Sequence, residues 1–274
     1  MSFRLAMVLG SVLLTVCMEP VVQDVEFLFT VVDVGEGLAQ IGAVNNHALL
    51  WDVGPADAYR NVYNAYLHLG KPRIEYIIIS HSDLDHCGGL SMLDTALNWS
   101  GKLAVSPFED TAYLRMLSCH WSKKVEFLIV KKGEVLNCLE NVNVNCLWPP
   151  DNSPFASGKN KNINSLVFNV TYGRTRCLIT SDIDSSVQNL LIQDVVNLQS
   201  DILVVPHHGS ENFSPFFIQY INPVYAIISC SDNNTYGHPS DKVLANLLSF
   251  GTTIHLTFSD GTLTFKSNTF YWSE

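Results

Sequence analysis

The order of apolar and polar positions predicts a chain in which strands and helices alternate irregularly. Its first strands form a meander, because short β-rich runs are separated only by turn residues; these runs are Phe27–Val34, Ala39–Val44 and Ala48–Val53. Apolar residues at helical spacing follow in Tyr59–Leu69, which ends before Gly70. Ile74–Ser80 is a continuous apolar run, which is typical of a strand buried on both faces.

The rest of the pattern continues with helices, a hairpin and helix–strand pairs. Helical spacing predicts helices at Ser91–Asn98, Asp110–Trp121, Ser185–Leu198, Pro215–Ile221 and Ser240–Phe250. β-rich runs predict strands at Val125–Val130, Val142–Leu147, Ser165–Thr171, Arg176–Thr180, Ile202–Val205, Tyr225–Ser229, Ile254–Phe258, Leu263–Lys266 and Phe270–Trp272. This order predicts an α/β fold, an αββα sandwich in a single domain, and does not suit the regular alternation of a doubly wound sheet.

Composition and charge restrict the partners. Hydrophobic residues make up 47% of the chain and charged residues 15%, so the chain can bury a large core and is not disordered. Sixteen basic and 26 acidic residues give a net charge of −10, which provides no general attraction to nucleic acid. We therefore expect no stable binding of duplex DNA, and a phosphate substrate would have to be held locally by metal.

The first residues resemble a targeting segment. Arg4 precedes an apolar run, Leu5–Val16, of the length of a secretory h-region, and small residues allow cleavage after Cys17. We expect residues 1–17 to be a signal peptide and 25–274 the domain, secreted or in the secretory-pathway lumen, with no membrane span after cleavage. The alternatives are a membrane anchor formed by residues 5–18 and a buried first helix.

The cysteine pattern leaves two interpretations open. Of seven cysteines, those beyond the leader are Cys87, Cys119, Cys138, Cys146, Cys177 and Cys230. An even number in a secreted chain is compatible with disulfides, but buried free thiols are equally compatible with a domain of this size. No CxxC pair is present, so cysteine is a poor candidate for a metal ligand.

The strongest chemical signal directly follows the strand at Ile74–Ser80. Four of the next six residues carry metal-binding groups: His81, Asp83, Asp85 and His86. Alternate residues of an extended loop point to the same side, so His81, Asp83 and Asp85 can converge while His86 approaches a second ion. A polar loop that only caps the next helix would explain one aspartate, but not two histidines and two aspartates.

This segment resembles the HxHxDH motif of the metallo-β-lactamase superfamily, with Asp83 in place of the second histidine. Further segments resemble the hydrolase domain of the ComEC-like competence proteins, in the same order along the chain. They are Val31–Gly37 (the opening strand), Leu50–Gly54 (the DTG step), Leu178–Asp182 (LLTGD), Val205–Ser210 (PHHGS) and Tyr236–Pro239 (YGHP). The resemblance covers about residues 27–258.

The resemblance implies two divalent metal ions, zinc or manganese, with magnesium as a further option. His81 and Asp83 would hold one ion, Asp85 and His86 the other, and Asp182 would bridge them. The last metal-ligating histidine would be His238, while His207 and His208 fall where related phosphodiesterases keep a proton-donating histidine; either could instead bind metal. Asp52 would orient a ligand loop without contacting metal.

One departure from the family pattern concerns its third motif. The family has a histidine shortly before the bridging aspartate, whereas this chain has Asn164-Ser165 in that position. Replacing two imidazoles by oxygen ligands gives the first site a harder ligand set, in the sense of hard and soft ligands. Manganese or magnesium then competes with zinc for it, or the site is weakly occupied.

The resemblance implies a hydrolase in which a metal-activated hydroxide attacks a phosphodiester, with Asp85 orienting the nucleophile and His207 or His208 protonating the leaving oxygen. A small phosphodiester or single-stranded nucleic acid suits the negative charge. The alternatives are an ester or lactone hydrolase on the same fold, and a non-catalytic secreted protein with a degraded metal site. The sequence leaves the oligomeric state open.

Overall fold

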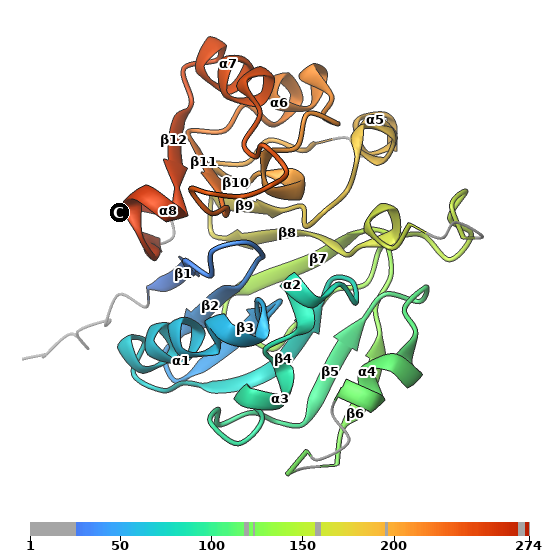
Figure 1. Ribbon diagram of the computed structural model, residues 1–274, viewed down its shortest axis with the longest axis vertical. Helices are drawn as coiled ribbons and strands as arrows, with labels where there is room; N and C mark the ends of the chain where they lie inside the picture. Colours follow the sequence, from blue (N-terminus) through green and yellow to red (C-terminus); the bar gives the residue numbers. More distant parts are fainter. Residues whose placement is uncertain are drawn as a thin grey trace, which may run out of the picture.

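Two β-sheets pack face to face between two layers of helices (Figure 1). This computed structural model describes residues 26–117, 121–122, 124–156, 160–194, 197–267 and 272–273. The arrangement is the αββα sandwich predicted from the sequence.

The first sheet contains the meander and the doubly buried strand. Its order is β14-β13-β1-β2-β3-β4-β5-β6. The strands are β1 (Phe27–Val31), β2 (Gln40–Val44), β3 (His47–Trp51), β4 (Arg73–Ile79), β5 (Lys102–Val105), β6 (Glu126–Ile129), β13 (Leu263–Ser267) and β14 (Trp272–Ser273). Because β3 and β4 are parallel, they end at the same edge, and Asp52 and Ser80 follow those two ends directly.

The second sheet has the order β12-β11-β10-β9-β8-β7. Its strands are β7 (Val142–Trp148), β8 (Val167–Tyr172), β9 (Thr175–Ile179), β10 (Ile202–Val204), β11 (Tyr225–Ile228) and β12 (Thr253–Leu256). Strands β9, β10 and β11 are parallel, so their carboxyl ends also share one edge. The residues just beyond these ends are Asp182, His207 with His208, and Ser229.

Helices cover the outer faces of both sheets. On the first sheet lie α1 (Tyr59–His68), α3 (Leu90–Leu93) and α4 (Thr111–Leu117), and on the second α5 (Ser185–Asp194), α6 (Pro215–Ile221) and α7 (Asp241–Ser249) (Figure 1). The short segments η1 (Ala56–Ala58), α2 (Leu84–Cys87), η2 (Asn162–Asn164), η3 (Pro206–Gly209) and α8 (Thr257–Asp260) connect them. Three layers of buried apolar side chains result, one between the sheets and one beneath each helix layer.

Aromatic side chains hold the two sheets together. Trp51 of β3 packs edge-on against Phe29 of β1 and Phe168 of β8, with ring centroids 6.3 and 6.4 Å apart. Such contacts contribute roughly 0.5–1.5 kcal/mol each beyond the burial of their area. Trp51 directly precedes Asp52, so this packing also fixes the strand end that begins the site.

Most predicted elements are confirmed, with local differences. The helix predicted at Ser91–Asn98 is wrong, because only Leu90–Leu93 is helical before the chain turns into β5, a strand that the sequence analysis missed. The strand predicted at Ile254–Phe258 ends at Leu256, and a short helix begins at Thr257. The helix predicted at Asp110–Trp121 begins at Thr111, and Trp121 lies outside any helix.

The predicted signal peptide, residues 1–17, and the alternative anchor, residues 5–18, lie outside the described residues and stay predictions. Within the described ranges, no helix has both the length and the apolar character that crossing a membrane requires. Five described cysteines are free thiols, namely Cys87, Cys138, Cys146, Cys177 and Cys230. Cys119 lies outside the described residues.

The approach of Gly37 to the loop after β4 provides a test of the fold. A Cβ at Gly37 would collide with the backbone carbonyl of Asp85, and its φ of +127° is unsuited to L side chains. We expect Gly37→Ala to lower the free energy of unfolding by about 3 kcal/mol or more in urea titrations. Gly35→Ala is the matched control, because a Cβ there at φ +70° meets nothing within 4 Å, and it should cost only about 1 kcal/mol. Equal losses in the two variants would contradict this close approach.

Candidate metal centre

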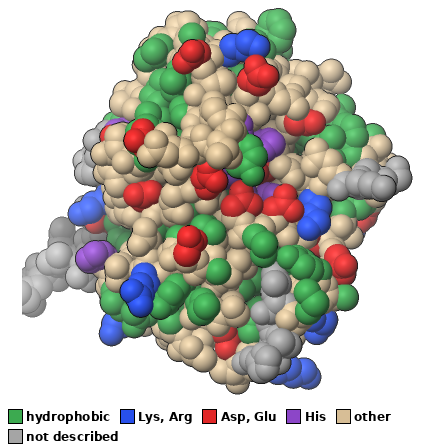
Figure 2. Space-filling view, viewed as in Figure 1, with side chains coloured by type: hydrophobic (Ala, Val, Ile, Leu, Met, Phe, Trp, Pro, Cys, Tyr) green, Lys and Arg blue, Asp and Glu red, His purple; other side chains and the backbone are tan. Residues whose placement is uncertain are grey.

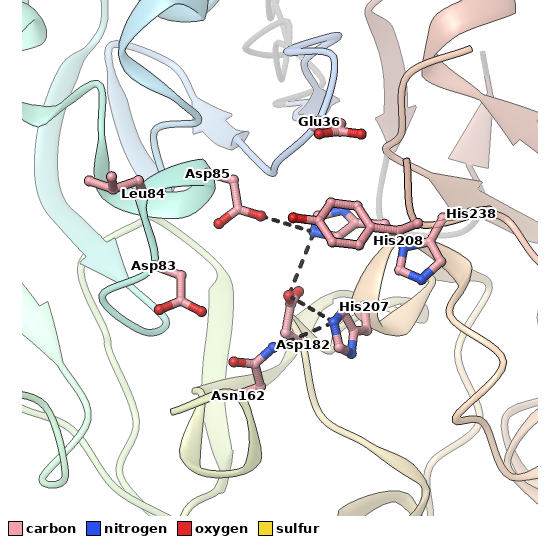
Figure 3. A pocket seen from close by; sticks show the side chains of 10 residues that line it. Glu36, Asp83, Leu84, Asp85, Asn162, Asp182, His207, His208 and His238 are labelled. Atoms are coloured by element: carbon pink, nitrogen blue, oxygen red, sulfur yellow. Dashed lines mark hydrogen bonds and ion pairs between the residues drawn. The ribbon is translucent and has the colours of Figure 1, made fainter. Parts of the chain in front are cut away.

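The strand ends of both sheets surround one cavity of about 360 Å³. Figure 2 shows acidic and histidine side chains gathered near the middle of the face that is turned toward the viewer. Figure 3 shows the side chains that line the cavity. They are Glu36, Asp83, Leu84, Asp85, Asn162, Asp182, His207, His208, Tyr236 and His238.

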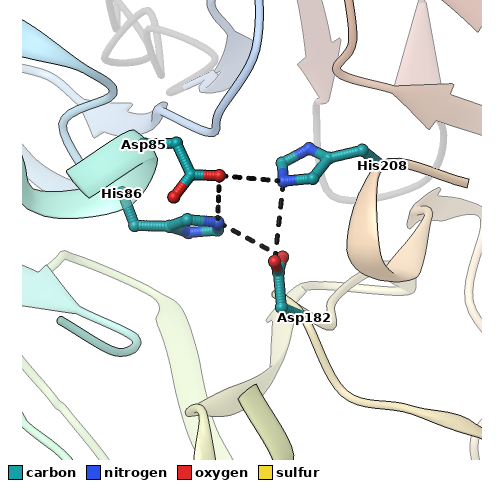
Figure 4. Close-up of side chains that lie close together, drawn as sticks. All are labelled: Asp85, His86, Asp182 and His208. Carbon is teal, nitrogen blue, oxygen red and sulfur yellow. Dashed lines mark ion pairs between the residues drawn. The ribbon is translucent and has the colours of Figure 1, made fainter. Parts of the chain in front are cut away.

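Four side chains, which we call the four-residue cluster, converge at the base of this cavity: Asp85, His86, Asp182 and His208 (Figure 4). One ligand atom from each lies within 4.8 Å of all the others. His86 Nε2 is 3.3 Å from Asp182 Oδ1 and 3.8 Å from Asp85 Oδ2. His208 Nε2 is 3.6 Å from Asp182 Oδ2 and 3.7 Å from Asp85 Oδ2.

Hydrogen bonds at the far nitrogens orient the two imidazoles of this cluster. His208 Nδ1 lies 2.8 Å from the carbonyl oxygen of Ser229, so it must donate a proton there. His86 Nδ1 lies 2.8 Å from Asp52 Oδ2, which likewise accepts its proton. Both Nε2 atoms therefore face the centre of the cluster. Asp52, which the sequence analysis expected to orient a ligand loop, thus contacts His86, and its role toward a metal stays a prediction.

Asp52 also organises the adjacent histidine through a serine. The backbone N–H and the hydroxyl of Ser80 both donate to the Asp52 carboxylate, each at 2.8 Å. Because the only Ser80 hydroxyl proton is used there, its oxygen accepts from Ser181 at 2.6 Å and from His81 Nδ1 at 3.1 Å. His81 Nε2 is thus left facing the cavity, in the orientation that a ligand needs.

A second group of side chains, which we call the second cluster, lies beside the first: His81, Asp83 and His207, with Asp182 shared. His81 Nε2 is 3.6 Å from Asp83 Oδ2 and 4.0 Å from Asp182 Oδ2. His207 Nε2 is 3.9 Å from Asp182 Oδ2. Asp182 lies between the two clusters, in the position that the sequence analysis expected of a bridging carboxylate.

His238 stands at the rim of the cavity and is not part of the four-residue cluster. Its ring centroid lies 5.7 Å from that of His207 and 6.5 Å from that of His208. Its backbone is held by Asn234, whose Oδ1 accepts from the His238 N–H at 2.8 Å. The four-residue cluster thus contains His208, which the sequence analysis allowed as a ligand, and the ligand role expected of His238 stays a prediction.

Strained backbone presents these side chains. Asp52, Ser181, His207 and His208 all have φ between +46° and +54°, in the left-handed region that costs roughly 1–3 kcal/mol for such residues. The His207 N–H donates to the carbonyl of Ser181 at 3.0 Å, which ties the two strained loops together. Strain of this kind persists only where the surrounding structure determines it fully.

The charges of the four-residue cluster are tightly coupled. Burial is the largest influence and would lower the pKa of His86 and of His208. Asp182 together with Asp52 raises the pKa of His86 well above its usual value, and Asp182 together with Asp85 raises that of His208 to about 9. Burial alone would raise the pKa of Asp85, but His208 and His86 lower it to about 2. The pKa of Asp182 is lowered well below its ordinary value by the same two imidazoles, against its burial. Without a bound cation, the cluster therefore holds protons on its histidines.

The sequence analysis missed two polar residues near the second cluster, one in the cavity wall and one beside Asp83. Asn164 does not replace the third-motif histidine, because its amide is used internally: its Oδ1 accepts from Ser153 at 2.6 Å and its Nδ2 donates to Phe155 O at 3.1 Å. Instead Asn162 lines the cavity, with Nδ2 3.5 Å from His207 Nε2. Lys161 reaches Asp83. No signal marks either residue in the sequence, since Lys and Asn are ordinary in a polar loop.

The residues present fit a divalent cation. The following buried atoms have no hydrogen-bond partner among the described residues: Nε2 of His81, His86 and His208, and Oδ1 of Asp182. Leaving a polar atom buried and unpaired costs about 1–3 kcal/mol, and these four atoms face one region. Imidazole nitrogens combined with carboxylate oxygens are a donor set that suits zinc and manganese.

Comparison with known proteins agrees with this geometry. The profile of the metallo-beta-lactamase superfamily matches residues 40–104. The competence protein ComA of Neisseria gonorrhoeae is 28% identical over 249 residues, covering 89% of this chain and 33% of that protein. The Escherichia coli protein YcaI is 31% identical over 225 residues, covering 80% of this chain and 27% of that protein. The chain thus spans a third or less of the length of these two relatives.

Among solved structures, the metallo-beta-lactamase fold protein YhfI of Bacillus subtilis has a TM-score of 0.55 at 11% identity, covering 87% of this chain and 99% of that one. This likeness shows the fold. Fold and site together place a histidine–aspartate cluster suited to divalent metal at the strand ends of an αββα sandwich. The chain has the metallo-β-lactamase fold, and in sequence it resembles the competence proteins over most of its length.

The coupled charges predict how metal binding depends on pH. A raised pKa means that the protonated imidazole persists to higher pH, and a metal ion binds only the neutral form. We expect the affinity for zinc or manganese to rise from about pH 6 up to about pH 9, the pKa of His208, by about tenfold per pH unit for each proton displaced. Calorimetry in buffers of different ionisation enthalpy measures both the affinity and the protons released. Affinity that is flat over this interval would contradict the charge coupling.

The hydrogen bonds of Asp52 predict a loss of metal affinity on its replacement. Asp52→Asn weakens the acceptor that orients His86 Nδ1, and such changes beside a ligand reduce metal affinity about 10–100-fold. Competition with a chromogenic chelator measures this. Asp94→Asn is the control, because Asp94 is also buried and accepts from Trp99 Nε1 at 3.1 Å, yet has no contact with the cluster. If both variants lose affinity equally, the effect is general destabilisation and the orienting role fails.

Proposed function

We propose that the chain is a metal-dependent phosphodiesterase that uses zinc or manganese. The observation that carries this proposal is the convergence of two carboxylates and two imidazoles whose Nε2 atoms are buried and unpartnered. A divalent ion held there would lower the pKa of a water and polarise a phosphoryl or carbonyl oxygen. The four-residue cluster is the principal binding position, and the second cluster is the position for a further ion.

We assign to Asp85 the role of orienting the nucleophilic water. Its side chain is 41% exposed, whereas those of His86 and Asp182 are 0% and 4% exposed. The carboxylate therefore reaches both the buried ligand atoms and the open cavity. Because its pKa is lowered to about 2, it stays ionised at neutral pH and accepts a hydrogen bond from an incoming water.

Two histidines at the cavity wall are available to exchange a proton with the leaving oxygen. His207 and His238 line the cavity. The pKa of each is lowered, chiefly by burial, so both are neutral near pH 7 and must take up a proton from the attacking water before they can give one to the leaving oxygen. His208, given as the alternative proton donor from the sequence, is oriented into the four-residue cluster, which favours a role as metal ligand. Of the two wall histidines, we assign the proton exchange to His207, which lies nearer Asp182 and carries no metal while only the four-residue cluster is filled.

The substrate class follows from the relatives and from the charge. Similarity to a competence protein supports a phosphodiester of the nucleic-acid type. The net charge of −10 and the carboxylates of Glu36, Asp83 and Asp85 at the cavity disfavour a long polyanionic duplex. We therefore assign the activity to a single strand or a small phosphodiester.

The proposal is tested by a substrate panel with added manganese or zinc. We expect turnover of an aryl phosphodiester or a short single strand, and a loss of kcat of about 10²–10³-fold in Asp85→Asn with an unchanged thermal unfolding midpoint. Asp151→Asn is the control, because Asp151 is an exposed carboxylate paired with Lys131 at 2.6 Å.

Three outcomes contradict the proposal in different ways. Turnover of lactones without phosphodiesters would identify an ester or lactone hydrolase. Unchanged rates in Asp85→Asn would remove the role of this carboxylate. Neither bound metal nor activity with any ion would identify a non-catalytic protein.

A further inference from the structure

A lysine ammonium lies at the edge of the second cluster. Lys161, directly before η2, places its Nζ 3.4 Å from Asp83 Oδ1 and donates to the carbonyl oxygen of Ser82, also at 3.4 Å. The same Nζ lies 5.1 Å from the centre of the Tyr113 ring, a cation–π contact. The loop at Ser82 and Asp83 and the Tyr113 ring of α4 therefore hold this cation in place.

Of the two carboxylates in the second cluster, Asp83 belongs to that cluster alone, whereas Asp182 also belongs to the four-residue cluster. Its Oδ2 is 3.6 Å from His81 Nε2, while its Oδ1 faces Lys161. Asp182 belongs to both clusters, so an ion in the four-residue cluster already uses part of its negative charge. The remaining donors of the second cluster, His81 and His207, are neutral ligands when they bind metal.

The two clusters therefore offer unequal electrostatic environments. The four-residue cluster has two carboxylates, Asp85 and Asp182, whose ion pairs within the cluster are with the imidazoles of His86 and His208. In the second cluster, Lys161 already neutralises Asp83. A second divalent ion would also be repelled by the ammonium, since like charges a few ångströms apart repel by an amount worth roughly tenfold in a binding constant even in water.

We propose that Lys161 sets the order of metal binding: the four-residue cluster takes the first ion tightly, and Lys161 competes with a second ion for Asp83. This inference rests on the proposed metal-dependent function. Lys161 is a positioning residue, because it acts on the metal through Asp83. At limiting metal the chain then holds one ion, and the ammonium remains at the cavity edge as a fixed positive charge.

Manganese titration of chelator-treated protein, followed by equilibrium dialysis and electron paramagnetic resonance, tests this proposal. We expect the wild type to bind one ion tightly, with a six-line spectrum, and a second at least about tenfold more weakly. Lys161→Met keeps an unbranched aliphatic side chain at this position but removes the charge. It should tighten the second ion about tenfold, with a coupled two-ion spectrum appearing at lower metal, and leave the first within about twofold.

Two variants serve as controls. Lys161→Arg keeps the charge and should behave as the wild type does. Lys132→Met removes a lysine that pairs with Asp194 at 3.1 Å, and it should change neither affinity. Thermal unfolding of each variant verifies that it is folded.

The remaining outcomes overturn the proposal and separate it from the proposed function. Two ions of equal affinity in the wild type, or an unchanged second affinity in Lys161→Met, would refute the role of Lys161 while the metal-dependent function stands. No bound manganese in any variant would refute both.

Discussion

Buried ligand atoms without hydrogen-bond partners are the constraint on which the site depends. His86 Nε2, His208 Nε2 and Asp182 Oδ1 are enclosed by protein and point at one another. Burial of such groups is unfavourable unless a partner compensates, and a divalent cation is a partner that all of them share. The protonated imidazoles offset part of this cost in the absence of a cation, which is why the pKa values of His86 and His208 are raised against their burial.

The fold supplies this constraint through strand ends. Parallel strands place Asp52 and Ser80 at the edge of the first sheet, and Asp182 and His208 at the edge of the second. The packing of Trp51 against Phe168 holds the two sheets together. Hydrogen bonds then fix the side chains, with the Asp52 carboxylate orienting both His86 and Ser80. Left-handed backbone at several of these positions is tolerated because contacts on both sides determine it. The same strand-end residues therefore contribute to the packing of the loops and to the geometry of the site.

The sequence predicted most of this arrangement where a pattern has a physical cause. The alternation of strands and helices indicated the sandwich, and the spacing of His81, Asp83, Asp85 and His86 after a buried strand indicated the cavity. The short strand β5 and the early end of α3 were missed, because four-residue elements leave little periodicity. Contacts between loops that are distant in the sequence could not be predicted, because they depend on loop geometry that adjacent residues do not encode. Examples are the pairing of Lys161 with Asp83, and the presence of His208 in place of His238 in the four-residue cluster.

The most direct test of the central claim is a crystal structure of the chain grown with manganese and measured at a wavelength that reveals manganese by anomalous scattering. The account predicts an anomalous peak among Asp85 Oδ2, His86 Nε2, Asp182 and His208 Nε2, within about 2.0–2.4 Å of these atoms. Peaks that lie only outside the two clusters, or no peak at saturating manganese, would contradict the account.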